Sequence, residues 1–480
     1  MNATPEKYSR ASRRAFLKVG VVIGGSLIVG IPLFDAAAEG DEAFLPNAFL
    51  KLEENGRITL SLPKSEMGQG VYTSLAMLVA EELEIDVAQL IIELPPGATP
   101  KDGAMTQGTG GSTSIRETWM PLRQASADTR MALIQAAARR WNVPASDCKA
   151  EKAIVWHPSS NKKLTYAELV RDAAAAPLPQ NTPLKASDTF RVIGRPQRRL
   201  DSRPKVNGTA IYGIDVIRPN MKIGTLAQSP VPGGRLGKIN EVAAMAVSGV
   251  SKVVRMDDAV AVIGNSYWTA KKGLDALEIE WIDGPNASMN QESLRQAQMQ
   301  AFMGTGKLAS DTGQSADKRK GENNPANSRV TAATYTQPFL AHAAMEPANC
   351  VAHWQPHSCE VWTGTQIPDT ARVLVAKLTG LPIERVTIHN FLLGGAFGRR
   401  LQADMITRTV EVARHCDGPV KLIWSREEDI RQDHFRPIYR DMVKASIDPS
   451  GKPAIWDHRI CGPSLMALST AVGFQASVAE

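Results

Sequence analysis

The sequence predicts an α+β protein made of several domains. With 480 residues, the chain is too long for one hydrophobic core, and about three domains are expected. Apolar residues alternate in short runs such as 58–62, which is typical of strands, and recur at helical spacing in longer runs such as 71–84. Both patterns are mixed within residues 185–284, which predicts a small α+β module there.

The composition is that of an ordinary globular protein, with 43% hydrophobic and 22% charged residues. The net charge of +6 comes from 55 basic and 49 acidic residues, and part of the excess lies in the first 18 residues, at Arg10, Arg13, Arg14 and Lys18. No basic stripe is interleaved with stacking aromatic residues, so nucleic-acid binding is not expected.

Residues 1–38 carry the features of a twin-arginine signal peptide. Residues 12–18 read Ser-Arg-Arg-Ala-Phe-Leu-Lys, an apolar run follows at 19–34, and the alanines at 36–38 offer a cleavage site. We therefore expect export to the periplasm by the twin-arginine route, which transports folded proteins that often carry a cofactor. An uncleaved N-terminal anchor is the alternative, and it would associate the protein with a membrane.

The five cysteines are widely spread, and their odd number argues against a disulfide scaffold. No Cys-x-x-Cys, Cys-x-x-Cys-His or ferredoxin-type run occurs, so the chain has no usual motif for an iron–sulfur cluster or a c-type haem. A zinc-like spacing does occur, but in a hairpin its side chains would divide between two faces and a turn, so zinc is the weaker interpretation. Its residues are Cys350, His353, His357 and Cys359.

Two loops in residues 43–180 end at the start of a predicted helix. The first is the Gly-Gln-Gly turn (residues 67–70, Met-Gly-Gln-Gly), which precedes a helix expected at 71–84. The second is the hydroxyl-rich loop (residues 108–114), which precedes a helix expected at 115–141. Unpaired N–H groups and the positive end of the helix dipole converge at such places, so both loops suit an anionic ligand.

Each of these loops also has a simpler interpretation. Ser112 or Ser114 could merely cap the helix that follows. Gly68 and Gly70 fit part of a dinucleotide-binding fingerprint, but its third glycine position holds Thr73, where close helix–strand packing needs glycine or alanine. A Rossmann unit is therefore the weaker interpretation of this segment.

The middle of the chain is expected to be a small module followed by a connector. Residues 285–328 are rich in asparagine, glutamine, serine, glycine and lysine, which predicts a polar linker. Before it, strands are expected at 210–213, 223–227, 250–256, 259–264 and 277–281, and helices at 240–247 and 266–276.

The third segment, residues 329–480, contains the stretch that carries most information. A β-branched run at 386–391 predicts a strand, the glycine loop (residues 394–400, Gly-Gly-Ala-Phe-Gly-Arg-Arg) follows, and a helix is expected at 405–413. Glycines expose backbone N–H groups to an anionic or oxygen-rich ligand. A tight turn whose glycines only supply positive φ angles explains the loop equally well. A hairpin at 350–364 and a helix at 369–378 are also expected.

Four features together resemble the large, molybdopterin-binding subunit of the xanthine dehydrogenase/aldehyde oxidoreductase family. They are residues 67–70, 342–347 (His-Ala-Ala-Met-Glu-Pro), 365–366 (Thr-Gln) and 394–400. The chain looks most like the exported branch typified by the isoquinoline 1-oxidoreductase β subunit and membrane-linked aldehyde dehydrogenases. The Gly-Gln-Gly segment stands first in the chain, an order characteristic of this branch.

The resemblance implies a multidomain molybdopterin-binding architecture with a small hammerhead-like α+β domain, whose first residues would be 205–215. After the signal peptide at 1–38, the expected parts are an N-terminal, permuted molybdopterin-binding segment at 43–180, the hammerhead-like domain at 185–284, the polar linker at 285–328, and the first molybdopterin-binding domain at 329–480, incomplete at its C-terminus.

The resemblance also implies a function. It is that of the large subunit of a molybdenum-dependent oxidoreductase, which hydroxylates an aldehyde or an N-heterocyclic aromatic compound with water as the oxygen source. The cofactor would be molybdopterin cytosine dinucleotide, without direct protein ligands to molybdenum. The [2Fe–2S] clusters are expected on a small partner subunit, because this chain lacks cluster motifs, and a cytochrome c subunit is expected next in line.

The cofactor-binding residues follow from the same resemblance. Gln366 and the backbone of Phe397 and Gly398 would lie at the oxo and pterin end, and the two loops of the first segment would hold pterin or phosphate. The Gly-Gln-Gly turn and the glycine loop should therefore meet in the folded chain. The full set is Gly68, Gln69, Gly70, Gly111, Ser112, Gln366, Gly394, Gly395, Ala396, Phe397, Gly398 and Arg399.

The sequence departs from the family pattern at several points. Ala396 replaces a glycine, which is a mild change if its φ is negative. Leu401 stands where purine-oxidising relatives place a glutamate, which argues against xanthine as substrate. The family's catalytic glutamate lies in a Gly-x-Gly-Glu segment that does not occur here, so the catalytic base is unidentified and Glu346 is its first candidate. A truncated cofactor-binding remnant without turnover is therefore the alternative function.

Overall fold

The computed structural model describes residues 20–23, 26–30, 49–94, 107–310 and 329–464. The chain divides into two compact units, one formed by residues 1–224 and 344–423 and the other by residues 225–343 and 424–480. Both units combine helices with sheets, which confirms the predicted α+β class. The predicted division into domains stays a prediction.

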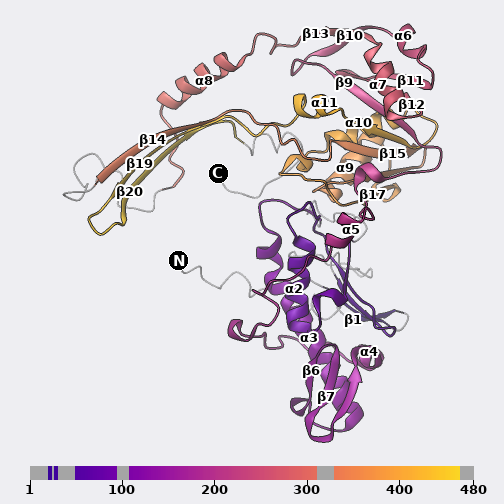
Figure 1. Cartoon of the computed structure of the whole chain (residues 1–480), viewed down its shortest axis with the longest axis vertical. Helices are drawn as coiled ribbons and strands as arrows, with labels where there is room; N and C mark the ends of the chain where they lie inside the picture. Colours follow the sequence, from indigo (N-terminus) through magenta and orange to yellow (C-terminus); the bar gives the residue numbers. More distant parts are fainter. Residues whose placement is uncertain (1–19, 24–25, 31–48, 95–106, 311–328, 465–480) are drawn as a thin grey trace. The chain divides into compact units, whose positions relative to one another are not determined.

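The first unit begins with a five-stranded sheet in the order β1-β2-β3-β4-β5, in which only β4 and β5 are parallel. Helices α2 (Val71–Leu83) and α3 (Ser114–Trp141) pack side by side (Figure 1). They share one hydrophobic core with the sheet, built around fully buried leucines such as Leu50, Leu75 and Leu133. The strands are β1 (Gly20–Ile23), β2 (Ser26–Gly30), β3 (Phe49–Glu53), β4 (Ile58–Ser61) and β5 (Leu90–Glu93).

A small sheet β6-β7-β8 and helix α4 complete this part of the unit, and α4 adds Tyr166, Leu169 and Val170 to the same core. A capping box at Thr165 and Glu168 explains where α4 begins. The bounds are β6 (Lys149–Glu151), β7 (Ile154–His157), β8 (Lys162–Thr165), α4 (Tyr166–Ala174) and α5 (Ser202–Val206).

The rest of the first unit is built on strands in the order β18-β15-β16-β17. The β15–β16 hairpin is antiparallel, whereas β17 lies parallel to β16 because helix α9 connects the two. Lys222–Gly224 of β9 pair with β18. The bounds are β15 (Asn349–Gln355), β16 (Ser358–Thr363), α9 (Pro368–Thr379), β17 (Val386–Asn390), α10 (Asp404–Ala413) and β18 (Val420–Ile423).

The second unit contains strands in the order β11-β12-β9, the pair β10–β13, and the antiparallel sheet β14-β19-β20 with helix α8 beside it (Figure 1). Its core includes Val260, Val262 and Leu277. The bounds are β9 (Lys222–Gln228), β10 (Arg235–Asn240), α6 (Val242–Met245), β11 (Val250–Arg255), β12 (Ala259–Gly264), α7 (Tyr267–Asp275), β13 (Glu278–Ile282), α8 (Gln291–Met303), β14 (Arg329–Gln337), α11 (Arg426–Arg431), β19 (Tyr439–Ile447) and β20 (Pro453–Cys461).

Most predicted elements are confirmed to within a few residues, among them α2, α3, α9, α10, β17 and the β15–β16 hairpin. Two expectations are wrong. The strand expected at 210–213 is an isolated bridge from Tyr212 to Leu392 followed by the 3₁₀ helix Gly213–Asp215. The segment expected as a polar linker contains α8, which begins at a capping box of Asn290 and Ser293. Residues 311–328 of that segment lie outside the described residues.

Part of the expected signal peptide is paired with the first sheet. Strand β2 is hydrogen-bonded to β3, and Leu27 and Val29 are buried in the core of the first unit. The arginine pair and the alanines at 36–38 lie outside the described residues. No helix in the described part of the chain is long and apolar enough to span a membrane.

Removing residues 1–38 is expected to destabilise the first unit, because it deletes β1 and β2 and exposes the edge of β3. Burial of Leu27 and Val29 alone corresponds to roughly 3–6 kcal/mol. Thermal unfolding of the chain with and without residues 1–38 checks this, and a deletion of residues 2–18 is the control. Equal unfolding midpoints would mean that β2 does not pair with β3 in solution.

Candidate functional site

The glycine loop has a backbone shape that few sequences could adopt. It connects β17 to α10, and Gly395 and Gly398 have φ angles of +98° and +104°. Phe397 also has a positive φ, +55°, although it is not a glycine, and the residue is 71% exposed. Ala396 is fully buried and has no positive φ, so the methyl group that replaces a glycine hydrogen is accommodated.

Arg400 and Glu346 hold this loop from inside the unit. The guanidinium of Arg400 donates to the carbonyls of Gly395 at 3.2 Å, Gly364 at 3.0 Å and Glu346 at 3.1 Å. It also donates to Oε2 of Glu346 at 2.9 Å. Both side chains are almost fully buried, so the ion pair is screened little by solvent.

The Glu346 carboxylate is saturated with hydrogen bonds. Besides Arg400, its Oε2 accepts from the N–H of Gly394 at 2.8 Å. Its Oε1 accepts from the N–H of Ile214 at 3.0 Å and from Nδ2 of Asn349 at 3.0 Å. These four hydrogen bonds give Glu346 a structural role in holding the loop, and its candidacy as the base stays a prediction.

Gly394 has no room for a side chain. A Cβ atom there would lie 2.4 Å from Cβ of Glu346. Its N–H and carbonyl both bind Glu346, so the loop cannot move away without breaking two hydrogen bonds.

Gly394→Ala is therefore expected to destabilise the first unit by about 1–3 kcal/mol, the usual cost of overpacking a buried site. Urea unfolding of the variant checks this value. Gly306→Ala is the control, because nothing lies within 4 Å of a Cβ atom at that position and its effect should be small. An unchanged midpoint for Gly394→Ala would show that the loop relaxes away from Glu346.

The Gly-Gln-Gly turn is organised by a second buried glutamate, Glu66. Its carboxylate accepts from the N–H groups of Gly68 and Gly70, both at 3.0 Å, and from that of Tyr72 at 3.1 Å. The side chain of Gln69 closes the same turn, since Oε1 accepts from the N–H of Met67 at 2.7 Å and Nε2 donates to the carbonyl of Ser65 at 2.9 Å.

These bonds change the role expected for the turn. The N–H groups of Gly68 and Gly70 already bind Glu66, so they do not face an anionic ligand as the sequence had suggested. The Gln69 amide is likewise occupied within the turn, whereas its backbone N–H has no acceptor among the described residues. The turn is thus a preformed support with an exposed tip.

The hydroxyl-rich loop is more open to an anion. Gly111 and Ser112 have positive φ angles of +58° and +54°, and both are exposed. The N-cap of α3 is Thr113, whose side chain makes no capping hydrogen bond, so neither predicted serine is the N-cap. The first turn of a 28-residue helix therefore keeps its N–H groups and positive dipole end available.

Buried hydrogen bonds link the residues that flank the three loops. Gln366 Nε2 donates to the carbonyl of Thr109 at 2.7 Å, and the N–H of Gln366 donates to the carbonyl of Arg400 at 3.0 Å. Ser65 Oγ donates to the carbonyl of Thr365 at 2.9 Å. The N–H of Leu393 donates to the carbonyl of Glu66 at 3.1 Å. The segments that carry the three loops are thus linked through the residues that flank them.

Gln366 lies where these loops meet, directly before α9. It is 3% exposed, and its Oε1 atom has no hydrogen-bond partner among the described residues. Leaving a buried acceptor unpaired costs about 1–3 kcal/mol, so such an atom in a native chain needs an explanation. A ligand that donates a hydrogen bond at this place supplies one.

Arg399 is engaged by its own chain. Its guanidinium makes a bidentate pair with Asp404 at 2.8 and 2.7 Å, at the start of α10. The positive charge of Arg399, a residue predicted to bind the cofactor, is thus compensated by Asp404 within the unit. The cofactor-binding roles of all twelve predicted residues stay predictions.

Sequence reasoning missed the residues that shape these loops, namely Glu66, Arg199 and Arg400. The local signal for Glu66 was its position directly before the Gly-Gln-Gly turn. In the second unit Asp433 is buried and bonded to Nδ1 of His342 at 3.0 Å.

The zinc-like group does not form a common site in the structure. Cys350 and Cys359 are fully buried, whereas His357 is exposed. Burial raises the pKa of each thiol to about 12, so both stay protonated and inert at neutral pH. Within the described ranges no group of three or more His, Cys, Asp or Glu side chains is arranged to hold a metal ion.

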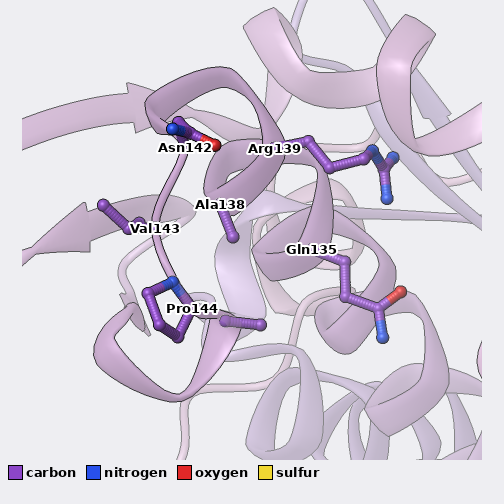
Figure 2. A pocket seen from close by; sticks show the side chains of 7 residues that line it. Gln135, Ala138, Arg139, Asn142, Val143 and Pro144 are labelled. Atoms are coloured by element: carbon purple, nitrogen blue, oxygen red, sulfur yellow. The ribbon is translucent and has the colours of Figure 1, made fainter.

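A shallow pocket lies at the C-terminal end of α3 (Figure 2). None of its lining residues belongs to the three loops, and the pocket is not part of the candidate site. The residues that line the pocket are Gln135, Ala138, Arg139, Asn142, Val143, Pro144 and Ala145.

Comparison with known proteins decides the family. Two molybdopterin cofactor-binding domain families match the chain, one over residues 4–219 and the other over residues 310–472. Together the two matches contain all three loops and Gln366. The chain belongs to the molybdopterin-binding subunits of the xanthine dehydrogenase family. The match at 4–219 also includes residues 4–38 of the expected signal peptide.

Similar members of the family include the isoquinoline 1-oxidoreductase subunit beta of Brevundimonas diminuta, 29% identical over 91% of this chain and 62% of that protein. The membrane-bound aldehyde dehydrogenase [pyrroloquinoline-quinone] of Gluconacetobacter polyoxogenes is 29% identical over 93% of this chain and 60% of that protein. The chain thus spans about three fifths of the length of these relatives. Quinoline 2-oxidoreductase from Pseudomonas putida 86 is a solved structure with 17% identity and a TM-score of 0.41, covering 54% of this chain and 38% of that one.

Proposed function

We propose that this chain binds molybdopterin cytosine dinucleotide as part of an oxidoreductase that hydroxylates an aldehyde or an N-heterocyclic aromatic compound. The observation that carries the proposal is the buried, unpaired Oε1 of Gln366 at the meeting point of three loops. Two of the most similar relatives are named for isoquinoline and for aldehyde oxidation, which supports this pair of substrate classes.

The residues present fit such a cofactor. The Gln366 amide keeps one donor hydrogen after the bond to Thr109 and an unpaired acceptor, which match the amide-like edge of a pterin. The exposed first turn of α3 suits the pyrophosphate of a dinucleotide. Phe397 is exposed and the glycine loop has positive φ angles, so backbone groups of this loop are accessible to a ligand. When bound, the cofactor would supply two-electron oxidation with oxygen taken from water.

The chain's own residues act by positioning rather than by proton transfer. Arg400 and Glu346 fix the glycine loop, and Gln366 ties the hydroxyl-rich loop to the start of α9. Glu66 and Glu346 each accept hydrogen bonds from backbone N–H groups and from an arginine, which is a structural role. The base that activates the nucleophile is therefore assigned to neither of them.

We also propose that electrons leave through a [2Fe–2S] partner subunit and then a cytochrome c subunit. The five cysteines follow no ferredoxin-type spacing, and burial raises the pKa of the Cys350 and Cys359 thiols, which does not favour cluster ligation. Copurification of the chain with its native neighbours is expected to bring down an iron–sulfur protein. Full-rate reduction of a natural acceptor by the single purified chain would refute the partner.

The experiment that tests the function uses the chain coexpressed with its neighbours in a host that makes the cofactor. Molybdenum and released cytidine nucleotide are measured per chain, and isoquinoline and an aldehyde are oxidised in ¹⁸O-labelled water with an artificial acceptor. Labelled product with bound molybdenum supports the proposal. No molybdenum overturns the cofactor, and molybdenum without turnover favours the cofactor-binding remnant instead.

Export by the twin-arginine route is part of the proposal. Changing Arg13 and Arg14 together to lysine keeps the charge but removes the motif that the translocase receptor reads. The variant is expected to accumulate in the cytoplasm, and fractionation followed by immunoblotting measures this. Arg10→Lys is the matched control and should be exported normally. Unchanged periplasmic protein in the double variant would rule out this route.

A further inference from the structure

We propose that Glu66 is a positioning residue whose carboxylate, paired with Arg199, sets the Gly-Gln-Gly turn in its ligand-binding shape before any cofactor is bound. The inference rests on the proposed function only for the identity of the ligand. The geometry of the turn stands on contacts within the first unit.

The Glu66 carboxylate takes the place that an external anion usually has at the start of a helix. It is 1% exposed and accepts from three backbone N–H groups, the last of which belongs to Tyr72 in the first turn of α2. Gly70, the N-cap of α2, offers no side chain for this purpose. The carboxylate therefore satisfies N–H donors that would otherwise remain unpaired. Its negative charge is stabilised by the positive end of the α2 dipole.

Arg199 closes the arrangement from a distant part of the chain. Its Nη2 donates to Oε1 of Glu66 at 3.0 Å, and its Nη1 donates to the carbonyl of Gly68 at 2.8 Å. Asp201 accepts from Nε and Nη2 of Arg199 at 2.9 and 2.7 Å, a bidentate pair that restrains the guanidinium. The hydrogen bond from Arg199, despite partial burial, holds the pKa of Asp201 at about 2, so this support stays charged at neutral pH.

The turn needs this support because its backbone is unusual. Gly68 and Gly70 have φ angles of +108° and +84°, and two such residues separated by one position have many alternative conformations when unbound. A ligand that had to order the turn would lose affinity by the entropy of ordering. Bonds from one carboxylate to three N–H groups remove that cost in advance.

The glycine loop is built in the same way, which argues that the arrangement serves the site. Glu346 is buried, accepts from the N–H of Gly394 and pairs with Arg400, which also binds a carbonyl of its loop. In each of the two loops, therefore, a buried glutamate accepts a hydrogen bond from a backbone N–H group of the loop, and an arginine donates one to a carbonyl of the loop. The ion pair of Glu82 and Arg123 in the same unit also has a fully buried glutamate but touches neither loop, and it serves as the control.

The test compares Glu66→Gln, Arg199→Lys and Arg199→Met with the control Glu82→Gln. Molybdenum bound per chain and its loss during prolonged dialysis are measured on the holoprotein coexpressed with its neighbours. Loss of the charge at Glu66 is expected to speed the loss of molybdenum about tenfold or more, because charge-assisted hydrogen bonds hold the turn. Arg199→Lys is expected to retain more than Arg199→Met, and Glu82→Gln is expected to match the wild type in retention even where it lowers the unfolding temperature.

Amide hydrogen exchange supplies a readout that needs no cofactor. In Glu66→Gln the amides of Gly68, Gly70 and Tyr72 are expected to exchange at least about tenfold faster in the cofactor-free chain, with α3 unchanged. Equal molybdenum retention in Glu66→Gln and the wild type, or equal losses in Glu66→Gln and Glu82→Gln, would overturn the inference. Faster amide exchange in a chain that never holds molybdenum would uphold the positioning role and reject the proposed function instead.

Discussion

Arg400→Met is expected to destabilise the first unit by about 3–5 kcal/mol, the largest effect predicted for a single substitution in this chain. The methionine fills a similar volume, but it leaves the Glu346 carboxylate buried without its counter-ion. It also removes the donors to the carbonyls of Gly364, Gly395 and Glu346. An uncompensated buried charge is far more costly than the loss of an equivalent pair at the surface.

Urea unfolding followed by circular dichroism measures this change. Arg171→Met is the matched control, since the pair of Arg171 with Glu54 is exposed and should contribute no more than about 1 kcal/mol. The double variant Arg400→Met with Glu346→Gln should recover part of the lost stability, because the unpaired charge is gone. A loss below about 1 kcal/mol for Arg400→Met would mean that water reaches Glu346 and that the loop is not held as described.

The elements around the site were predictable because their signals are local. Helix α2 and helix α10 have apolar residues at helical spacing, and β17 is a β-branched run, so periodicity places all three. Helix α8 was missed because it lies in a segment rich in polar residues and nearly all of its own residues are exposed, so no buried face marks it. Its capping box was the one available local signal.

The residues that shape the loops could not be found in this way. Glu66 and Arg199 lie 133 positions apart, and Glu346 and Arg400 lie 54 positions apart. Such pairs depend on the complete tertiary fold, and no spacing rule connects them. The glycines were visible in the sequence, but which of their N–H groups would face a ligand depended on where these carboxylates point.

Gln366→Met is expected to leave the fold nearly as stable as the wild type while removing most of the bound cofactor. The backbone bonds of Gln366 to Thr109 and Arg400 do not involve the side chain and remain. Only the bond from Nε2 to the Thr109 carbonyl is lost, and its cost is offset because the unpaired buried Oε1 disappears too. The free energy of unfolding of the cofactor-free chain should therefore change by less than about 1 kcal/mol.

The effect on the loaded protein should be much larger, because the amide offers a ligand both an acceptor and a donor that methionine lacks. Losing two hydrogen bonds in a buried site corresponds to about 10- to 100-fold weaker retention. Molybdenum per chain after dialysis measures it, and Gln366→Glu, which adds a buried negative charge beside the carbonyl of Thr109, should retain less still. If Gln366→Met retains molybdenum like the wild type, the unpaired oxygen of Gln366 does not face the cofactor, and the observation that carries the proposed function is lost.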